Sequence, residues 1–143
     1  MTLTQKSTGI YTDDSFNSVL PNIDSIIFDC DGVLIDITKS YDETIIKTVQ
    51  YVLENFAKID DSIKVNFAII DGFKATGGFN DEVDLAYAAI ISFVAAKKLK
   101  KDPIKFIFTV IENSDSSGIV SVQNYLKTQV DISEIITKLS YPG

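Results

Sequence analysis

Only one segment of this chain has the pattern of a buried strand, and every later apolar pattern has helical spacing. The strand-like segment covers about residues 24–29, between the turn Pro21-Asn22 and the turn glycine Gly32. A short apolar run bounded by turn residues is consistent with a buried strand. Because a lone strand cannot form a sheet, the sequence predicts a mostly α fold with a minimal β element. We expect residues 1–22 to form a frayed start or a short packing arm.

The rest of the chain predicts helices. Apolar residues at helical spacing place them at about residues 41–56, 63–74, 80–98, 103–111, 119–128 and 132–139. The 63–74 segment favours a helix but is ambiguous because of its branched residues. Ser40 and Glu43 have the spacing of a capping box, and Asp102 precedes a first-turn proline. The cluster Lys97–Lys101 is typical of a helix end, where cations suit the helix dipole.

Composition excludes several classes of function. The chain has 143 residues, a size that fits one ordinary domain. It has 20 acidic against 13 basic residues, and the net charge of −7 argues against nucleic acid as a partner. Nothing resembles a secretory signal or a membrane span, so we expect a cytoplasmic protein with no membrane partner. The absence of histidine excludes imidazole chemistry and histidine-ligated zinc, which leaves carboxylates as acid, base and metal-binding groups.

Two aspartates follow the strand-like run, in Asp29-Cys30-Asp31-Gly32-Val-Leu-Ile-Asp36. Side chains alternate along a strand, so Asp29 and Asp31 are expected on one side and Cys30 on the other. We expect Cys30, the single cysteine, to be a small buried residue behind the acids. Paired carboxylates at the carboxyl end of a strand suit a divalent cation together with a phosphate group.

Two simpler interpretations of this run explain less. A calcium loop of the EF-hand type has glycine at its sixth position and glutamate at its twelfth. Counted from Asp29, Gly32 is fourth and Ser40 is twelfth, so the calcium interpretation fails. A plain solvated turn does not explain why the acids directly follow the apolar residues 26–28, at the expected edge of a core where unpaired charge is costly.

The run Asp29–Asp36 resembles the first motif of the haloacid dehalogenase (HAD) superfamily, the Asp-x-Asp-Gly-Val/Thr-Leu signature of its phosphatases. This resemblance implies that Asp29 is the nucleophile that attacks phosphorus and that Asp31 is the acid/base. It also implies Mg²⁺ as cofactor, held by Asp29 and by the backbone carbonyl of Asp31. The implied substrate is a small phosphorylated metabolite, hydrolysed through an aspartyl-phosphate intermediate.

Residues from about Lys39 onward resemble the helical cap that one subclass of this superfamily inserts after its first motif. The stretch Phe73–Leu85, with Ser40-Tyr41 upstream, is similar to an archaeal and bacterial subgroup of capped HAD hydrolases. The resemblance therefore implies two regions. Residues 1–38 are the N-terminal piece of a partial HAD-like core with one main strand, and residues 39–143 are the helical cap.

The cap offers two candidate substrate-binding residues, Lys74 and Asn80, on either side of the Gly77-Gly78 pair. Lys74 is either an anion contact or a solvated lysine at a helix end, and the second is favoured. Asn80 is either a ligand group or a helix cap, and the cap is favoured. Asp36 is expected to fix the turn through backbone hydrogen bonds rather than to bind metal.

The later motifs of the superfamily, a lysine and a pair of acids on a fourth strand, are not found. Residues 106–109 could be the second motif, because an apolar run ends there on a threonine hydroxyl, but Asp102-Pro103 favours a helix instead. We therefore expect an incomplete N-terminal portion of a hydrolase, inactive alone, that self-associates through residues 24–30 or joins a complementing core chain. The alternative is a non-catalytic helical interaction module, or one subunit of a split hydrolase.

Overall fold

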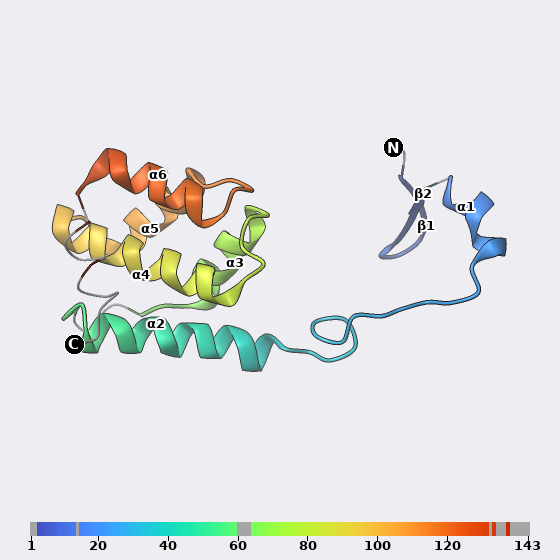
Figure 1. Cartoon of the computed structure of the whole chain (residues 1–143), viewed down its shortest axis with the longest axis horizontal. Coiled ribbons are helices and arrows are strands. Elements are labelled where there is room, and N and C mark those ends of the chain that lie inside the picture. Colours follow the sequence, from blue (N-terminus) through green and yellow to red (C-terminus); the bar gives the residue numbers. More distant parts are fainter. Residues whose placement is uncertain (1–2, 14, 60–63, 132, 134–136, 138–143) are drawn as a thin grey trace. The chain divides into compact units, whose positions relative to one another are not determined.

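A computed structural model of the chain describes residues 3–13, 15–59, 64–131, 133 and 137 (Figure 1). The chain divides into two compact units, residues 1–36 and 37–143. The division falls within two residues of the expected end of the first region at residue 38. Within the described residues the fold is mostly helical with one small sheet, as the sequence predicts.

The sheet lies at the start of the first unit, where the sequence suggested only a frayed start or a packing arm. Strand β1 (Leu3–Ser7) pairs with β2 (Ile10–Asp13) as an antiparallel hairpin in which Leu3 faces Asp13. Gly9 has a φ of +77° in the connecting turn, a conformation that glycine adopts at little cost. The short helix α1 (Phe16–Val19) and the 3₁₀ turn η1 (Leu20–Asn22) follow.

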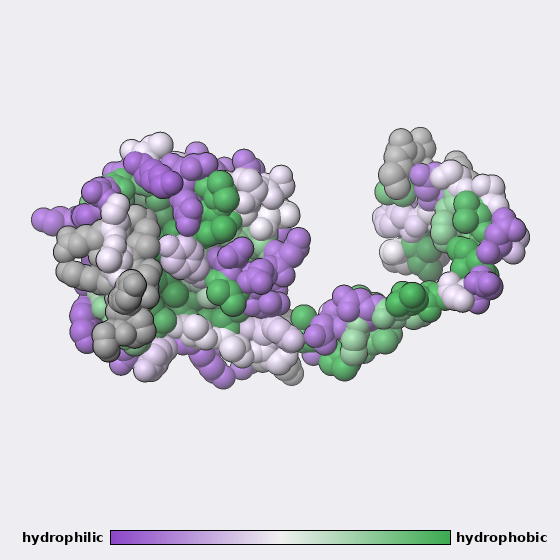
Figure 2. Space-filling model, in the orientation of Figure 1, coloured by the Kyte–Doolittle hydropathy of each residue, from purple (hydrophilic) through white to green (hydrophobic). Residues whose placement is uncertain are grey.

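The predicted buried strand at residues 24–29 is wrong for this structure. Residues 23–29 belong to no helix or strand, and Ile26, Ile27 and Phe28 are 72%, 95% and 62% exposed. Apolar surface marks this segment in Figure 2. A strand is defined by hydrogen bonds to a neighbour, and the sheet in the described part of the chain contains only β1 and β2. The apolar run is therefore present without the sheet that would bury it.

Where the structure describes the second unit, it contains five α-helices: α2 (Glu43–Asn55), α3 (Phe67–Ala75), α4 (Glu82–Leu99), α5 (Pro103–Glu112) and α6 (Ile119–Gln129). Helix α4 contacts each of the other four (Figure 1). Its middle, residues 85–96, is buried or half-buried and almost entirely apolar, as expected of a helix enclosed by others, and its alanines let neighbouring helices approach closely. Ser92, a buried polar residue on α4, donates its hydroxyl proton to the Ala88 carbonyl.

Side-chain caps explain where several helices begin. Asn66, Asp81 and Asp102 each accept hydrogen bonds from backbone amides in the first turn of α3, α4 and α5. The Asp102-Pro103 start is confirmed, so residues 106–109 lie inside α5 and cannot be the strand of a second motif. The ambiguous 63–74 segment is confirmed as a helix that begins at Phe67. Most of the predicted helix 132–139 lies outside the described residues.

The predicted capping box at Ser40 and Glu43 does not form. A π-helical turn, η2 (Thr38–Asp42), precedes α2, and no side chain caps the first amides of α2. Ser40 instead donates its hydroxyl proton to the carbonyl of Ile37 at 3.0 Å. The chain thus enters α2 through a wide turn.

The cluster Lys97–Lys101 ends α4 as predicted, with Lys100 in the left-handed conformation after the last turn. The Lys97 ammonium donates to the carbonyls of Ala57 and Lys58, which follow the end of α2. Among the described residues, no helix has both the length and the apolar character that crossing a membrane requires.

Candidate functional site

The motif Asp29–Asp36 folds into a turn that closes on itself. The amides of Leu34 and Ile35 donate to the carbonyl of Cys30 at 2.9 and 3.0 Å, and the amide of Gly32 donates to the carbonyl of Ile35 at 2.9 Å. Gly32 has a φ of +76°, which side-chain-bearing residues rarely adopt. The glycine of the motif is therefore required by the backbone of the turn, which forms without help from a surrounding sheet.

The two acids of the motif lie on exposed backbone at the start of this turn. Asp29 accepts a hydrogen bond at Oδ1 from the amide of Cys30 at 2.8 Å. Asp31 pairs with Ile35 through an isolated bridge. Cys30 is exposed, so its predicted place as a buried residue behind the acids is wrong. In the part of the chain that the structure describes, the one sheet pairs β1 with β2 and does not include this segment.

The donor set around these acids does not by itself fit a magnesium site. Mg²⁺ takes a near-ideal octahedron of oxygen ligands and commonly keeps several waters. Among the residues that the structure describes, no three histidine, cysteine, aspartate or glutamate side chains gather where one ion could bind. Asp29 and Asp31 thus supply at most part of a coordination sphere.

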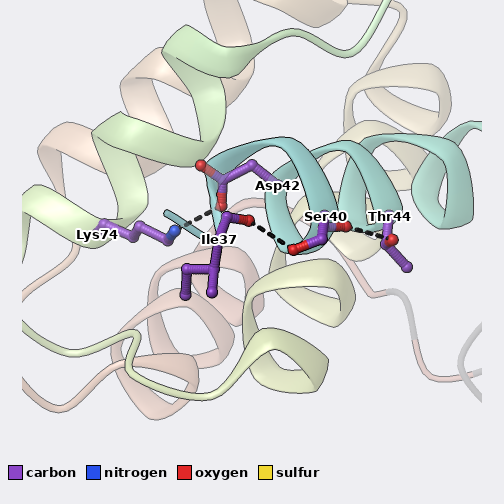
Figure 3. A network of polar contacts seen from close by, with 5 residues as sticks. All are labelled: Ile37, Ser40, Asp42, Thr44 and Lys74. Atoms are coloured by element: carbon purple, nitrogen blue, oxygen red, sulfur yellow. Dashed lines mark hydrogen bonds and ion pairs between the residues drawn. The ribbon is translucent and has the colours of Figure 1, made fainter. Parts of the chain in front are cut away.

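In the second unit, Lys74 lies at the last turn of α3 and points toward η2 (Figure 3). Its ammonium is 2.6 Å from the Asp42 carboxylate, with side chains 41% and 7% exposed, respectively. The buried carboxylate of Asp42 thus already supplies the negative charge that an anionic ligand would otherwise bring to Lys74. The favoured interpretation of Lys74 as merely solvated is therefore incomplete, since the residue joins α3 to the start of α2.

Asn80 is exposed and immediately precedes the cap of α4. The capping role that the sequence favoured for it belongs to Asp81, whose carboxylate accepts from the amides of Val83 and Asp84 at 2.8 and 3.1 Å. Capping alone thus gives no reason for an asparagine at position 80.

Asp42 was not among the residues predicted from the sequence, although a signal was present. Asp42 lies three residues before Ile45 and seven before Val49, so it continues the buried stripe of α2. An acid on an apolar stripe predicts a buried carboxylate, and such a group needs a partner. The partner itself, Lys74, is 32 residues away and could not be inferred from helical spacing.

The structure thus divides the candidate residues between the two units: Asp29 and Asp31 lie in the first, Lys74 and Asn80 in the second. It defines the class of protein only coarsely, as a helical unit preceded by an exposed segment that carries an acidic turn. No family model, no curated protein and no solved structure matches this chain.

Proposed function

We propose that this chain carries the nucleophile segment and the helical cap of a Mg²⁺-dependent HAD-type phosphatase. The rest of the catalytic core comes from residues outside this sequence, in the same protein or in a complementing chain. The substrate is a small phosphorylated metabolite, and the chain by itself is inactive or nearly so.

One observation carries this proposal: the apolar run before the motif is exposed and belongs to no helix or strand. Ile26, Ile27 and Phe28 are exposed to water. They directly precede a turn that is already closed by its own backbone hydrogen bonds. Burying such side chains stabilises a protein by about 1.5–3 kcal/mol each. Addition to the sheet of a completed core would account for an apolar run that has no partner strand among the described residues.

The proposed chemistry uses the two acids of the turn. A carboxylate oxygen of Asp29 attacks phosphorus, forming an aspartyl phosphate while the bond from phosphorus to the ester oxygen breaks. Asp31 gives its proton to the leaving oxygen and later takes one from the water that attacks the aspartyl phosphate, which releases inorganic phosphate. The Asp29 carboxylate and the backbone carbonyl of Asp31 would hold Mg²⁺ together with oxygen ligands from the completing part of the core, and the ion would neutralise charge between carboxylate and phosphate.

The experiment begins with the coding sequence downstream of this chain. We expect it to encode a lysine motif and a motif with two adjacent acids, in frame or nearly so. The two parts are then produced together and assayed with p-nitrophenyl phosphate and Mg²⁺. Activity should require both parts and should be lost in Asp29→Asn and Asp31→Asn. The control Asp24→Asn changes an acid of the same segment outside the motif and should keep the activity.

Two results would contradict the proposal in different ways. If the purified chain alone hydrolyses p-nitrophenyl phosphate at an ordinary enzymatic rate and Asp29→Asn abolishes this, the chain is a hydrolase but is not incomplete. If no downstream motifs exist and the chain has no activity with any partner, the hydrolase assignment itself is wrong.

A second function, a non-catalytic helical interaction module, has one observation in its favour. Residues 37–143 bury their own apolar core, centred on α4, and this core needs no metal or active site to form. Absence of the downstream motifs, combined with a folded and monomeric second unit, would favour this module over the phosphatase.

A further inference from the structure

The chain contains two aspartate–glycine pairs, Asp31-Gly32 and Asp71-Gly72, in very different surroundings. Asp31 and Gly32 are exposed and lie in the turn of the acidic motif. Asp71 and Gly72 lie inside helix α3. The two pairs have the same local chemistry, so a difference in their reactivity must come from the structure around them.

An aspartate that is followed by glycine can form a ring with its own backbone. The glycine amide nitrogen attacks the carbon of the protonated side-chain carboxyl group, and the amide proton and the carboxyl hydroxyl leave as water. Glycine has no Cβ, so its amide nitrogen is the least hindered. Water then opens the five-membered succinimide ring. Breaking the bond from nitrogen to the side-chain carbon restores aspartate, whereas breaking the bond to the main-chain carbonyl carbon gives isoaspartate.

The turn that holds Asp31-Gly32 can open without unfolding the rest of the chain. The Gly32 amide donates to the Ile35 carbonyl at 2.9 Å and must leave this bond before it reacts. The backbone hydrogen bonds that close the turn join residues within 30–35. None of the described residues from 3 to 36 is buried. Openings that break few buried contacts have free energies near zero, so the Gly32 amide is readily released.

Asp71-Gly72, in contrast, is held by packing. The neighbouring side chains of Ile70 and Phe73 are both 0% exposed. A Cβ atom built on Gly72 would lie 3.0 Å from Cδ1 of Ile111, so this side of α3 packs closely on α5. The ring can close only after Asp71 leaves its helical dihedral angles, and this requires the middle of α3 to unwind from the core.

We propose that Asp31 is a site of spontaneous covalent modification, at which the aspartate converts to isoaspartate through a succinimide formed with Gly32, and that α3 protects Asp71. Water is the only co-reactant: one molecule is released and one is consumed. The product has one additional backbone carbon atom, which changes the spacing of the groups that close the turn. The inference rests on the turn itself and does not depend on the proposed phosphatase activity.

The test follows both pairs in the folded full chain, kept in neutral buffer made with water enriched in heavy oxygen. Peptides are separated by chromatography and identified by mass spectrometry with electron-transfer fragmentation, which distinguishes isoaspartate from aspartate. We expect isoaspartate to form at position 31 at least about tenfold faster than at position 71, a difference of about 1.4 kcal/mol in the free energy of opening. The isoaspartate should carry one heavy oxygen, because water opens the ring. Equal rates at the two positions would overturn the proposal.

Urea and one variant provide the controls. In urea the two pairs should react at similar rates, and position 31 should react about as fast there as in the folded chain. A much slower reaction at position 31 in the folded chain would show that the turn protects Asp31 and would contradict the proposal. Gly32→Val should remove most of the isoaspartate at position 31 and leave position 71 unchanged, because a β-branched side chain crowds the attacking nitrogen. An unchanged rate at position 31 in this variant would mean that the ring does not form at the Gly32 amide.

Discussion

Gly78 and Gly118 meet backbone to backbone, one before α4 and the other before α6. A Cβ atom built on Gly78 would lie 2.4 Å from the amide nitrogen of Gly118 and 2.6 Å from the carbonyl oxygen of Asp115. Real Cβ atoms essentially never approach other atoms this closely. The loop before α4 and the loop before α6 can come into contact only because neither position carries a side chain. This contact joins the two loops.

Gly78→Ala should therefore destabilise the second unit by about 1–3 kcal/mol, the usual cost of forcing extra atoms into a packed site. Urea unfolding followed by circular dichroism would measure this loss. Gly77→Ala is the matched control, since Gly77 has a φ of +78° but nothing within 4 Å of a Cβ, and should cost only about 1 kcal/mol of backbone strain. Equal losses for the two variants would mean that the Gly78–Gly118 contact is not tight.

The Asp42–Lys74 pair should respond unequally to removal of its two partners. Lys74→Met leaves a carboxylate that is 7% exposed without its cation, whereas Asp42→Asn leaves a lysine that is 41% exposed and can be hydrated. We expect Lys74→Met to lower the free energy of unfolding by about 1–3 kcal/mol and Asp42→Asn by less. The double variant should recover part of the loss that Lys74→Met causes.

Lys47→Met tests a comparable pair on the surface. The Lys47 ammonium lies 3.3 Å from the Glu43 carboxylate, and both side chains are well exposed. Exposed helical pairs of this spacing contribute only about 0.3–0.5 kcal/mol. If Lys47→Met lowered the free energy of unfolding as much as Lys74→Met, burial of the Asp42 carboxylate could not be the reason for the larger effect expected at Lys74.

The pKa of Asp115 should lie below its ordinary value. The hydroxyl of Ser117 and then its amide donate to the carboxylate at 2.5 and 2.8 Å, and these bonds hold the pKa of Asp115 below its ordinary value of 3.8. A lowered folded-state pKa gives stability that is present above pH 3.8 and is lost as the pH falls through the folded value. Carbon NMR of the carboxyl group should therefore show the pKa of Asp115 rising in Ser117→Ala.

Asp131 provides an internal control for that titration. The carboxylate of Asp131 accepts hydrogen bonds from the hydroxyl and the amide of Ser133, and these bonds likewise lower its pKa. Ser117 takes no part in them. Ser117→Ala should leave the titration of Asp131 unchanged. A shift of both carboxyl groups would indicate a general change in the fold rather than loss of one hydrogen bond.

The exposed apolar segment should make the chain self-associate. Extended backbone with large apolar side chains is a template for pairing with another chain. We expect light scattering to detect dimers or larger species that decrease in Ile27→Lys. Val83→Lys, which changes an exposed apolar residue on α4, should leave association unchanged. A strictly monomeric wild-type chain would contradict this prediction.

The helices could be predicted from the sequence because their signals are local. Apolar spacing is enough to identify α2 and α4–α6, and Asp102 with Pro103 is enough to identify the start of α5. The hairpin at residues 3–13 was missed, since its strands are short and largely polar. The strand predicted at 24–29 does not form, although its apolar residues suit a buried strand. A sheet depends on hydrogen-bonded neighbours, and the local sequence pattern does not reveal them.

By itself, the sequence determined the helical composition of the second unit and the acidic turn at Asp29–Gly32, because caps, spacing and a glycine with positive φ act over a few residues. Only the tertiary structure decided that Asp42 pairs with Lys74, that Gly78 meets Gly118 and that residues 23–29 stay exposed. Each of these depends on which distant segments pack together, and packing is settled by the whole chain rather than by any one stretch of it.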